Sequence, residues 1–471
     1  MAVYKIFLSA DATIYSAYPA KNAGRDEVIE VSVKNSQDGL RFIDRTLLEQ
    51  SPYYSYDLAA NDNYTTTENI FPSNDIRRSL IQFSNQDLAI IKTFASQSVS
   101  GSWEAYLRLG LAFAQNLNTG YTIEAFAVSE SWTMGTGKYT TVPEIRNGVC
   151  WDYTGPYKHS PIWVSDPLYW GNYDMGNWDG AIADSIIWDQ SYDEVYITWN
   201  QVLDAWNINP YYFNYPIINP RAGGGFWNTD YTASQYFDYM SNKDINMDVT
   251  SIVDKWFSGA LNNNGLILKH PTDLETNSNT FIDLKFFSVD THTIYPPCIE
   301  LRWDDSHYYP IGSNYALNDE ITITLANNPG TFKKGSVYKF RTAVRETYPT
   351  RQFTTASVYL NSLYLSQESY WAIQDMKTNE MVVNFDDNYT KISADNQSNY
   401  FYLYMNGLEL ERYYRILIKT KIYSTTFGPL SIYNNQQAIY DALSLYSPED
   451  LSLLPGEIVI KDSNLIFKVI S

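Results

Sequence analysis

The residue types that carry most enzyme chemistry are present in this chain, but they lack catalytic spacing. The four histidines, His159, His270, His292 and His307, fall in separate segments. No two of them have the His-Glu-x-x-His or His-x-His spacing that sets zinc ligands on one face. The chain also lacks a Gly-x-Ser-x-Gly elbow and a P-loop lysine. We therefore expect a protein that is not an enzyme, with no catalytic residues and no cofactor.

Acidic residues offer two alternatives. One aromatic-rich stretch contains four aspartates from which a glycosidase would draw its carboxylate pair: Asp174, Asp179, Asp184 and Asp189. Asp and Asn also cluster at residues 57–63 and 386–395, where several oxygens would suit a structural calcium ion. Neither cluster has the EF-hand spacing, and such clusters commonly form turns. Calcium is therefore an alternative to our expectation of no cofactor.

The aromatic-rich stretch, residues 157–216, contains six tryptophans. Loops of this length commonly have a function of their own. Trp170, Trp178 and Trp188 are our candidates for stacking on a ligand, for which a host-surface glycan is the expected class. The alternative is that the stretch only covers one end of a sandwich.

Composition predicts an all-β protein and excludes two classes of partner. The 471 residues include 33 basic and 53 acidic side chains, for a formal net charge of −20. Such a charge repels nucleic acid and anionic lipid, and no apolar run approaches the ~18 residues of a membrane span. Aromatic residues make up 16% of the chain, and they favour strands and interfaces. Cys150 and Cys298 are too few for a disulfide scaffold, so we expect small buried hydrophobes.

The elements expected in the N-terminal region are mainly strands. One helix, at 249–258, should bury Ile252, Val253, Trp256 and Phe257 on one face. We expect Thr250 to cap this helix and Gly259 to end it. A further helix is predicted at 88–98. The predicted strands are 3–9, 12–17, 27–33, 77–83, 103–114, 121–128, 266–268, 283–288 and 298–303.

An ordered set of motifs in this region resembles the disaggregatase-related (DNRLRE-type) β-sandwich domain. The motifs are DATIYS, Tyr18-Pro19, Asn22-Ala23-Gly24, RSLIQF, SESWTMGTG, GVCWDY, MDVTSIVDKWFSG and NNNGLILK, spread over residues 9–303. Further stretches, at 219–227 and 286–306, are similar to the version of this domain in virion structural proteins of contractile-tailed bacteriophages of marine bacteria. The resemblance implies a jelly-roll-like β-sandwich at 1–306, with the 157–216 stretch as an insertion.

A linker at 307–318 and a second β region at 319–422 follow. Turn signals separate strands predicted at 320–325, 336–345, 354–364, 370–375, 381–385, 400–405 and 412–422, which favours one or two Ig-like sandwiches. The stretch KFRTAVRETYPTRQF resembles the same phage proteins. Residues 423–471, with a helix at 436–444 and a strand at 465–470, are predicted to be a docking segment. Its candidate interface residues are Phe427, Leu430, Tyr433, Tyr440 and Tyr446.

The resemblance implies a virion structural protein, made in the host cytoplasm without a signal peptide and assembled into the tail, baseplate or neck. Its partners would be other virion proteins and copies of itself in a symmetric arrangement. The competing class is a carbohydrate-binding adhesin that uses exposed Trp and Tyr side chains.

Overall fold

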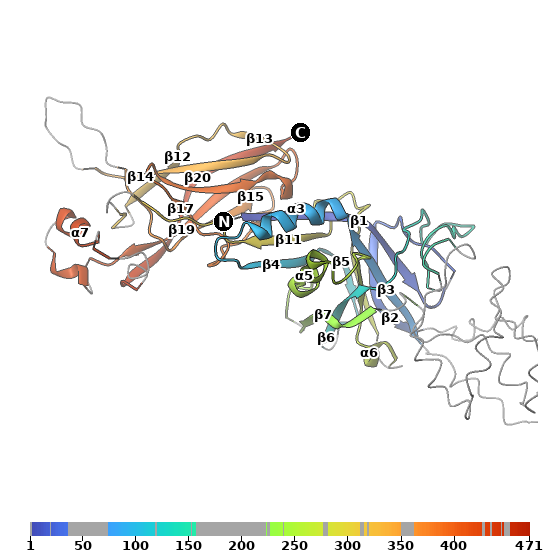
Figure 1. The fold of residues 1–471 in the computed structure, drawn as a ribbon. Helices are drawn as coiled ribbons and strands as arrows, with labels where there is room; N and C mark the ends of the chain where they lie inside the picture. Colours follow the sequence, from blue (N-terminus) through green and yellow to red (C-terminus); the bar gives the residue numbers. More distant parts are fainter. Residues whose placement is uncertain are drawn as a thin grey trace, which may run out of the picture. The chain divides into compact units, whose positions relative to one another are not determined.

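The chain folds into two compact units, each built mainly of β-strands (Figure 1). The computed structural model describes residues 2–18, 20–35, 74–117, 120–151, 153–156, 223, 227–238, 240–276, 281–310, 315–317, 320–349, 362–425, 429–433, 436–443, 445–446 and 453–471. The first unit is Phe7–Leu88 with Tyr106–Cys298, and the second is Met1–Ile6, Ala89–Ala105 and Ile299–Ser471. The all-β prediction is confirmed.

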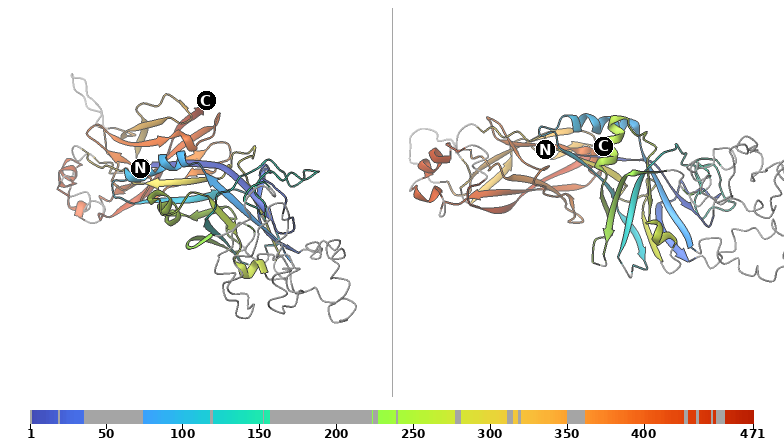
Figure 2. Two further views of the ribbon diagram at one scale, coloured as in Figure 1. Left: turned by 45° about the vertical axis from the view of Figure 1, so that its right-hand side comes forward. Right: turned by 60° about the horizontal axis from the view of Figure 1, so that its bottom comes forward.

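Strand β3 is central to the first unit. Along one edge it pairs with β1, while its other edge pairs first with β2 and then, at Ser79–Ile81, with β9. Beyond β2 lies β10 and then β5, and beyond β9 lies β6 and then β7; Figure 2 shows these strands from two further directions. The bounds are β1 Ala2–Tyr15, β2 Val28–Asn35, β3 Asn74–Phe83, β5 Leu111–Gln115, β6 Tyr121–Val128, β7 Trp227–Phe237, β8 Ile245–Asp248, β9 Leu266–Lys269 and β10 Ile282–Phe287.

The two faces of β3 differ in chemistry because side chains alternate along a strand. Ile76 and Leu80 join an apolar core with Ala12, Ile14 and aromatic residues of the 126–151 region. Arg77 and Ser79 lie on the opposite face and are also buried. A buried polar face is unusual for a sandwich, and it becomes the basis of the candidate site.

Helix α5, Thr250–Ser258, buries Ile252, Val253 and Trp256 as predicted, and Gly259 ends it with a φ of 76°. Phe257 is only half-buried. The predicted cap is wrong: Thr250 lies inside the helix, and its backbone N–H donates to Asp248 Oδ1 at 2.9 Å. The described residues also form helices α3 Asn85–Ser96, α6 Thr272–Thr276 and α7 Gln436–Leu443 and the short 3-10 helices η5 Met405–Gly407 and η6 Pro429–Ile432.

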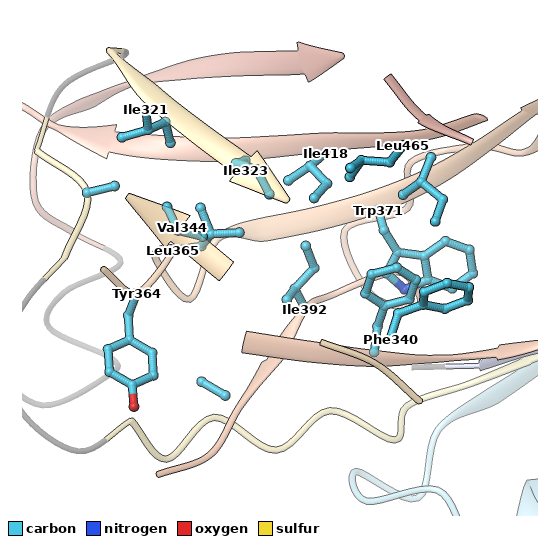
Figure 3. Close-up of a cluster of buried hydrophobic side chains, with 14 of the residues drawn as sticks. Ile321, Ile323, Phe340, Val344, Tyr364, Leu365, Trp371, Ile392, Ile418 and Leu465 are labelled. Carbon is cyan, nitrogen blue, oxygen red and sulfur yellow. The ribbon is translucent and has the colours of Figure 1, made fainter. Parts of the chain in front are cut away.

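The second unit is one sandwich of two sheets. The four-stranded sheet has the order β12-β14-β18-β17, and the five-stranded sheet has the order β13-β20-β19-β15-β16. Aromatic rings stack between them: the ring centres of Phe340 and Phe401 are 5.5 Å apart, and those of Trp371 and Phe401 are 5.2 Å apart. Figure 3 shows Phe340 and Trp371 in this core. The bounds are β12 Ile321–Leu325, β13 Thr331–Lys333, β14 Val337–Glu346, β15 Ser369–Asp375, β16 Met381–Val383, β17 Ser393–Ala394, β18 Asn399–Tyr404, β19 Tyr413–Tyr423 and β20 Gly456–Ile470.

The predicted boundary at 306 differs from the boundary between the units. Residues before Phe7 and from Ala89 to Ala105 belong to the second unit, as does the chain after Cys298. An aromatic cluster there joins distant segments: Phe94 lies 5.0 Å from Tyr4 and 4.9 Å from Trp303, which lies 5.3 Å from Tyr404. The boundary accordingly falls within or beside β1, α3, β4 (Trp103–Leu109) and β11 (Cys298–Trp303).

Two other predicted divisions also change. In the predicted linker, the Tyr308 hydroxyl donates to Leu365 O at 2.6 Å, and Tyr315 and Ala316 are buried in the core of the second unit. In the predicted docking segment, β20 pairs with β19 over most of its length, and Leu443 and Leu454 are buried in the same core. Both segments therefore form part of the second sandwich. The tail contributes a strand to one of its sheets, and both segments contribute apolar side chains to its core.

Candidate functional site

Three of the motifs that carry the resemblance meet at Asn22 in the first unit. This side chain is fully buried, and its Nδ2 donates to Met134 O at 2.8 Å and to Val149 O at 2.9 Å. Its Oδ1 accepts the Gly137 N–H at 2.8 Å. One amide therefore satisfies three backbone groups of the SESWTMGTG and GVCWDY segments, which lie more than 100 residues away in sequence.

Glycines allow these segments to approach closely. A Cβ added at Gly148 would lie 2.4 Å from the Gly135 Cα, a distance that no side chain tolerates. Gly135 itself has a φ of +77°, in the left-handed region. The spacing of these glycines is thus explained by backbone packing around Asn22.

A buried ionic network lies on the polar face of β3. Arg77 contacts Glu30 at 2.6 Å and Asp75 at 2.8 Å, and Lys285 contacts Glu30 at 3.1 Å. Burial opposes the charge of Arg77, but the two carboxylates hold its pKa above the ordinary value. The Arg77 guanidinium also lies 5.1 Å from the ring centre of Tyr15. Because Glu30 already accepts from two cations, this network is suited to holding strands together rather than to proton transfer.

Asp11 is a further buried carboxyl on this face, 1% exposed. Its Oδ2 accepts the Val289 N–H at 2.6 Å, in the turn that follows β10. Burial raises the pKa of Asp11 to about 7, with a further contribution from the nearby Asp290 charge. A carboxyl so deeply buried has no access to a large substrate, so the raised pKa affects stability rather than catalysis.

Arg78 forms a clamp on the opposite face of β3. It makes two bonds to Glu275, at 3.0 and 2.7 Å, and a third to Gly223 O at 2.7 Å. Lys269 lies 3.4 Å from the same Glu275 carboxylate, and burial lowers the pKa of Lys269. Gly223 N also donates to Trp151 O at 2.7 Å. The clamp therefore ties together the residues that flank the aromatic insertion on either side.

Sequence analysis missed both arginine clusters, although a signal was present. Arg77 and Arg78 are adjacent in a predicted strand, so they must face opposite sides of the sheet. Each guanidinium then needs a buried carboxylate. That inference predicts at least one buried carboxylate for each arginine but does not identify Glu30, Asp75 or Glu275.

The predicted site residues fall into three groups. Trp170, Trp178, Trp188 and Phe427, and the side chain of Tyr440, lie outside the described residues. Tyr433 and Tyr446 are half-buried and pack against the core of the second unit. Leu430 is 1% exposed in that core, so its prediction as an interface residue is wrong.

Of the two predicted calcium clusters, one lies outside the described residues and the other makes a turn and an ion pair. Residues 57–63 belong to the part that is not described. Asp386 Oδ1 accepts the N–H groups of Asn388 and Tyr389, which makes a turn, and Asp395 pairs with Arg341 at 2.7 Å. Within the described ranges, no group of three or more His, Cys, Asp or Glu side chains is placed to hold a metal ion. Cys150 and Cys298 are both buried, as predicted.

Among the residues that the structure describes, no helix has the length and apolar character to span a membrane. The comparisons with known proteins gave no significant match, either to a protein-family model or to a curated protein.

Proposed function

We propose that the chain is a non-enzymatic structural protein of a tailed bacteriophage virion, placed in the tail, baseplate or neck. The observation that carries the proposal is the convergence of three of the quoted motifs, Asn22-Ala23-Gly24, SESWTMGTG and GVCWDY, on the Asn22 side chain. Motifs that lie far apart in sequence but contact one buried amide are what we expect of a single type of domain, whose fold brings them together. The resemblance to contractile-tail virion proteins is the reason for proposing that this domain lies in a phage particle.

The buried charges support a scaffold in place of an active site. Glu30, Asp75 and Glu275 each contact an arginine at 2.6 to 2.8 Å. Paired buried charges of this kind fix geometry but leave no carboxylate poised for a substrate. On this proposal the partners are other virion proteins and further copies of the chain.

Quantitative mass spectrometry of purified particles tests the proposal. We expect the chain at a fixed copy number per particle, and electron microscopy of the particle should locate both sandwiches. Recovery of the chain only from the particle-free fraction of the lysate would contradict a virion role.

A pair of variants tests whether the contacts of Asn22 are needed for incorporation into particles. Asn22→Ala should lower incorporation into particles, because it frees the segments that the amide holds. Asn242→Ala, which changes an exposed side chain that hydrogen-bonds to Asp244, should be incorporated as the wild type is.

An activity assay tests the non-enzymatic part separately. The purified chain should not hydrolyse polysaccharide or peptidoglycan. Turnover that disappears in Asp179→Asn would replace the structural proposal with a glycosidase.

A further inference from the structure

The sequence contains three Asn-Gly steps, at residues 147–148, 264–265 and 406–407. An asparagine before glycine is prone to lose its amide, because glycine has no side chain to shield its backbone nitrogen. That nitrogen forms a bond to the asparagine Cγ, the bond from Cγ to Nδ2 breaks, and ammonia leaves with the proton of the backbone nitrogen. Water then opens the five-membered imide to aspartate or isoaspartate, so the reaction needs no other reagent.

Two of these steps lie in main chain that is held by regular structure or by several contacts. Asn406 and Gly407 belong to the short helix η5. Asn264 precedes strand β9, and its Nδ2 donates to Ser129 O at 2.8 Å while its backbone carbonyl accepts the Trp132 Nε1–H at 2.8 Å. Main chain held in this way resists the rearrangement that closes the imide ring.

The third step, at Asn147, is held by one exposed residue. The Asn147 Oδ1 accepts the Thr136 N–H at 2.9 Å, and its Nδ2 donates to Thr136 Oγ1 at 2.8 Å. Both residues are exposed, and neither lies in a helix or a strand. Exposed contacts outside regular structure open at the lowest free-energy cost. The Asn147 amide is therefore the easiest of the three to release.

We propose that Asn147–Gly148 is the site at which this chain deamidates, and that the Thr136 hydroxyl sets the rate. The bond from Cγ to Nδ2 breaks in the reaction, so Nδ2 must leave Thr136 before ammonia departs. The hydrogen bond to the hydroxyl opposes that departure. The proposal goes beyond the virion role and does not depend on it.

The product should disturb the contacts at Asn22. Gly148 packs so closely that an added Cβ would lie 2.5 Å from Met134 O. Isoaspartate inserts an extra main-chain carbon immediately before Gly148, where this packing leaves no room. The next residue, Val149, provides a carbonyl that accepts from Asn22 Nδ2 at 2.9 Å. Deamidation at this step is thus expected to release a segment that Asn22 holds.

Peptide mapping of the full-length chain, aged in mildly alkaline buffer, tests the proposal. Mass spectrometry follows the conversion of amide to acid at each Asn-Gly step. In the wild type, Asn147 should be converted before Asn264 and Asn406. Thr136→Val removes the hydroxyl and should raise the rate at Asn147 about 5-fold, the factor that one net hydrogen bond supplies. Hydrogen exchange at residues 148–150 should be faster in the aged wild type than in fresh protein.

Thr140→Val is the matched control, because it makes the same change at an exposed position in the same segment. It should leave the rate at Asn147 unchanged. The readout is the rate at Asn147 relative to the other two steps, because general unfolding accelerates all three together. Earlier conversion at Asn264 or Asn406 overturns the proposal, as do equal relative rates in the two threonine variants. An Asn147 that stays intact in both the wild type and Thr136→Val overturns it as well. None of these results bears on whether the chain is found in particles.

Discussion

In the second unit, three stacked rings, Phe340, Phe401 and Trp371, fill the space between two sheets. In the first unit, the central strand instead carries Arg77 and Arg78 on opposite faces, and each binds buried carboxylates. The second unit thus relies mainly on apolar burial, which is non-directional. The first relies in addition on directed polar contacts, each of which requires a particular residue. From this difference we expect substitutions to destabilise the two units for different reasons.

Removing a ring from the stack is expected to have the largest effect. Trp371→Ala should lower the free energy of unfolding by about 5 kcal/mol, because the side chain is fully buried between the sheets. Trp256→Ala, on helix α5 of the first unit, should cost about 3 kcal/mol, since that side chain is 8% exposed. Hydrogen exchange resolved by peptide should place each loss in its own unit. Equal changes in hydrogen exchange in both units after either substitution would contradict the expectation that each unit is destabilised separately.

Breaking the Arg78 clamp should have the next largest effect. Arg78→Met leaves the Glu275 carboxylate buried with Lys269 as its remaining cation, and should cost about 4 kcal/mol in urea denaturation. Arg146→Met, which removes a half-exposed arginine paired with Glu144 at 3.3 Å, should cost about 0.5 kcal/mol or less. Similar losses for the two variants would show that burial of the pair has no energetic consequence.

The pH dependence of stability should come partly from Asp11. Its folded-state pKa, about 7, lies above its ordinary value of 3.8, so the folded state holds a proton that the unfolded chain releases. The contribution is therefore complete below pH ~4 and is lost as the pH rises through 7, by about 4 kcal/mol in all. Thermal denaturation between pH 5 and 8 should show this decline in the wild type.

Asp11→Asn keeps an oxygen for the Val289 N–H and should flatten that decline. Asp254→Asn, at an exposed position on α5, should keep the wild-type slope. An unchanged slope in Asp11→Asn would assign the decline to other groups.

The smallest predicted effect is at Asn22. Asn22→Ala leaves two buried carbonyls and one N–H without their partner, and should cost about 2 kcal/mol, measured by urea denaturation. Hydrogen exchange should rise first at residues 133–137 and 148–150. A global loss without this local signature would indicate that Asn22 acts through general packing.

Local patterns of apolar residues located most of the strands and helix α5. Alternation is a local property, so the strand predictions at 121–128, 298–303 and 400–405 lie within one residue of β6, β11 and β18. The same holds for α5, whose apolar spacing identified Ile252, Val253 and Trp256 as its buried face. Asn22 and the glycines were singled out as motif members, although their geometric reason was not visible.

Tertiary structure decided which elements pair and which unit each segment joins. The single strand predicted at 103–114 divides at Gly110, because β4 pairs with β8 while β5 pairs with β10. The tail forms a strand of the second sandwich because it pairs with the edge of β19. A local sequence pattern does not show which strand edge is open to such pairing. The Arg78–Glu275 contact joins residues 197 positions apart. Such contacts depend on chain topology, which brings distant residues together only after the sheets have formed.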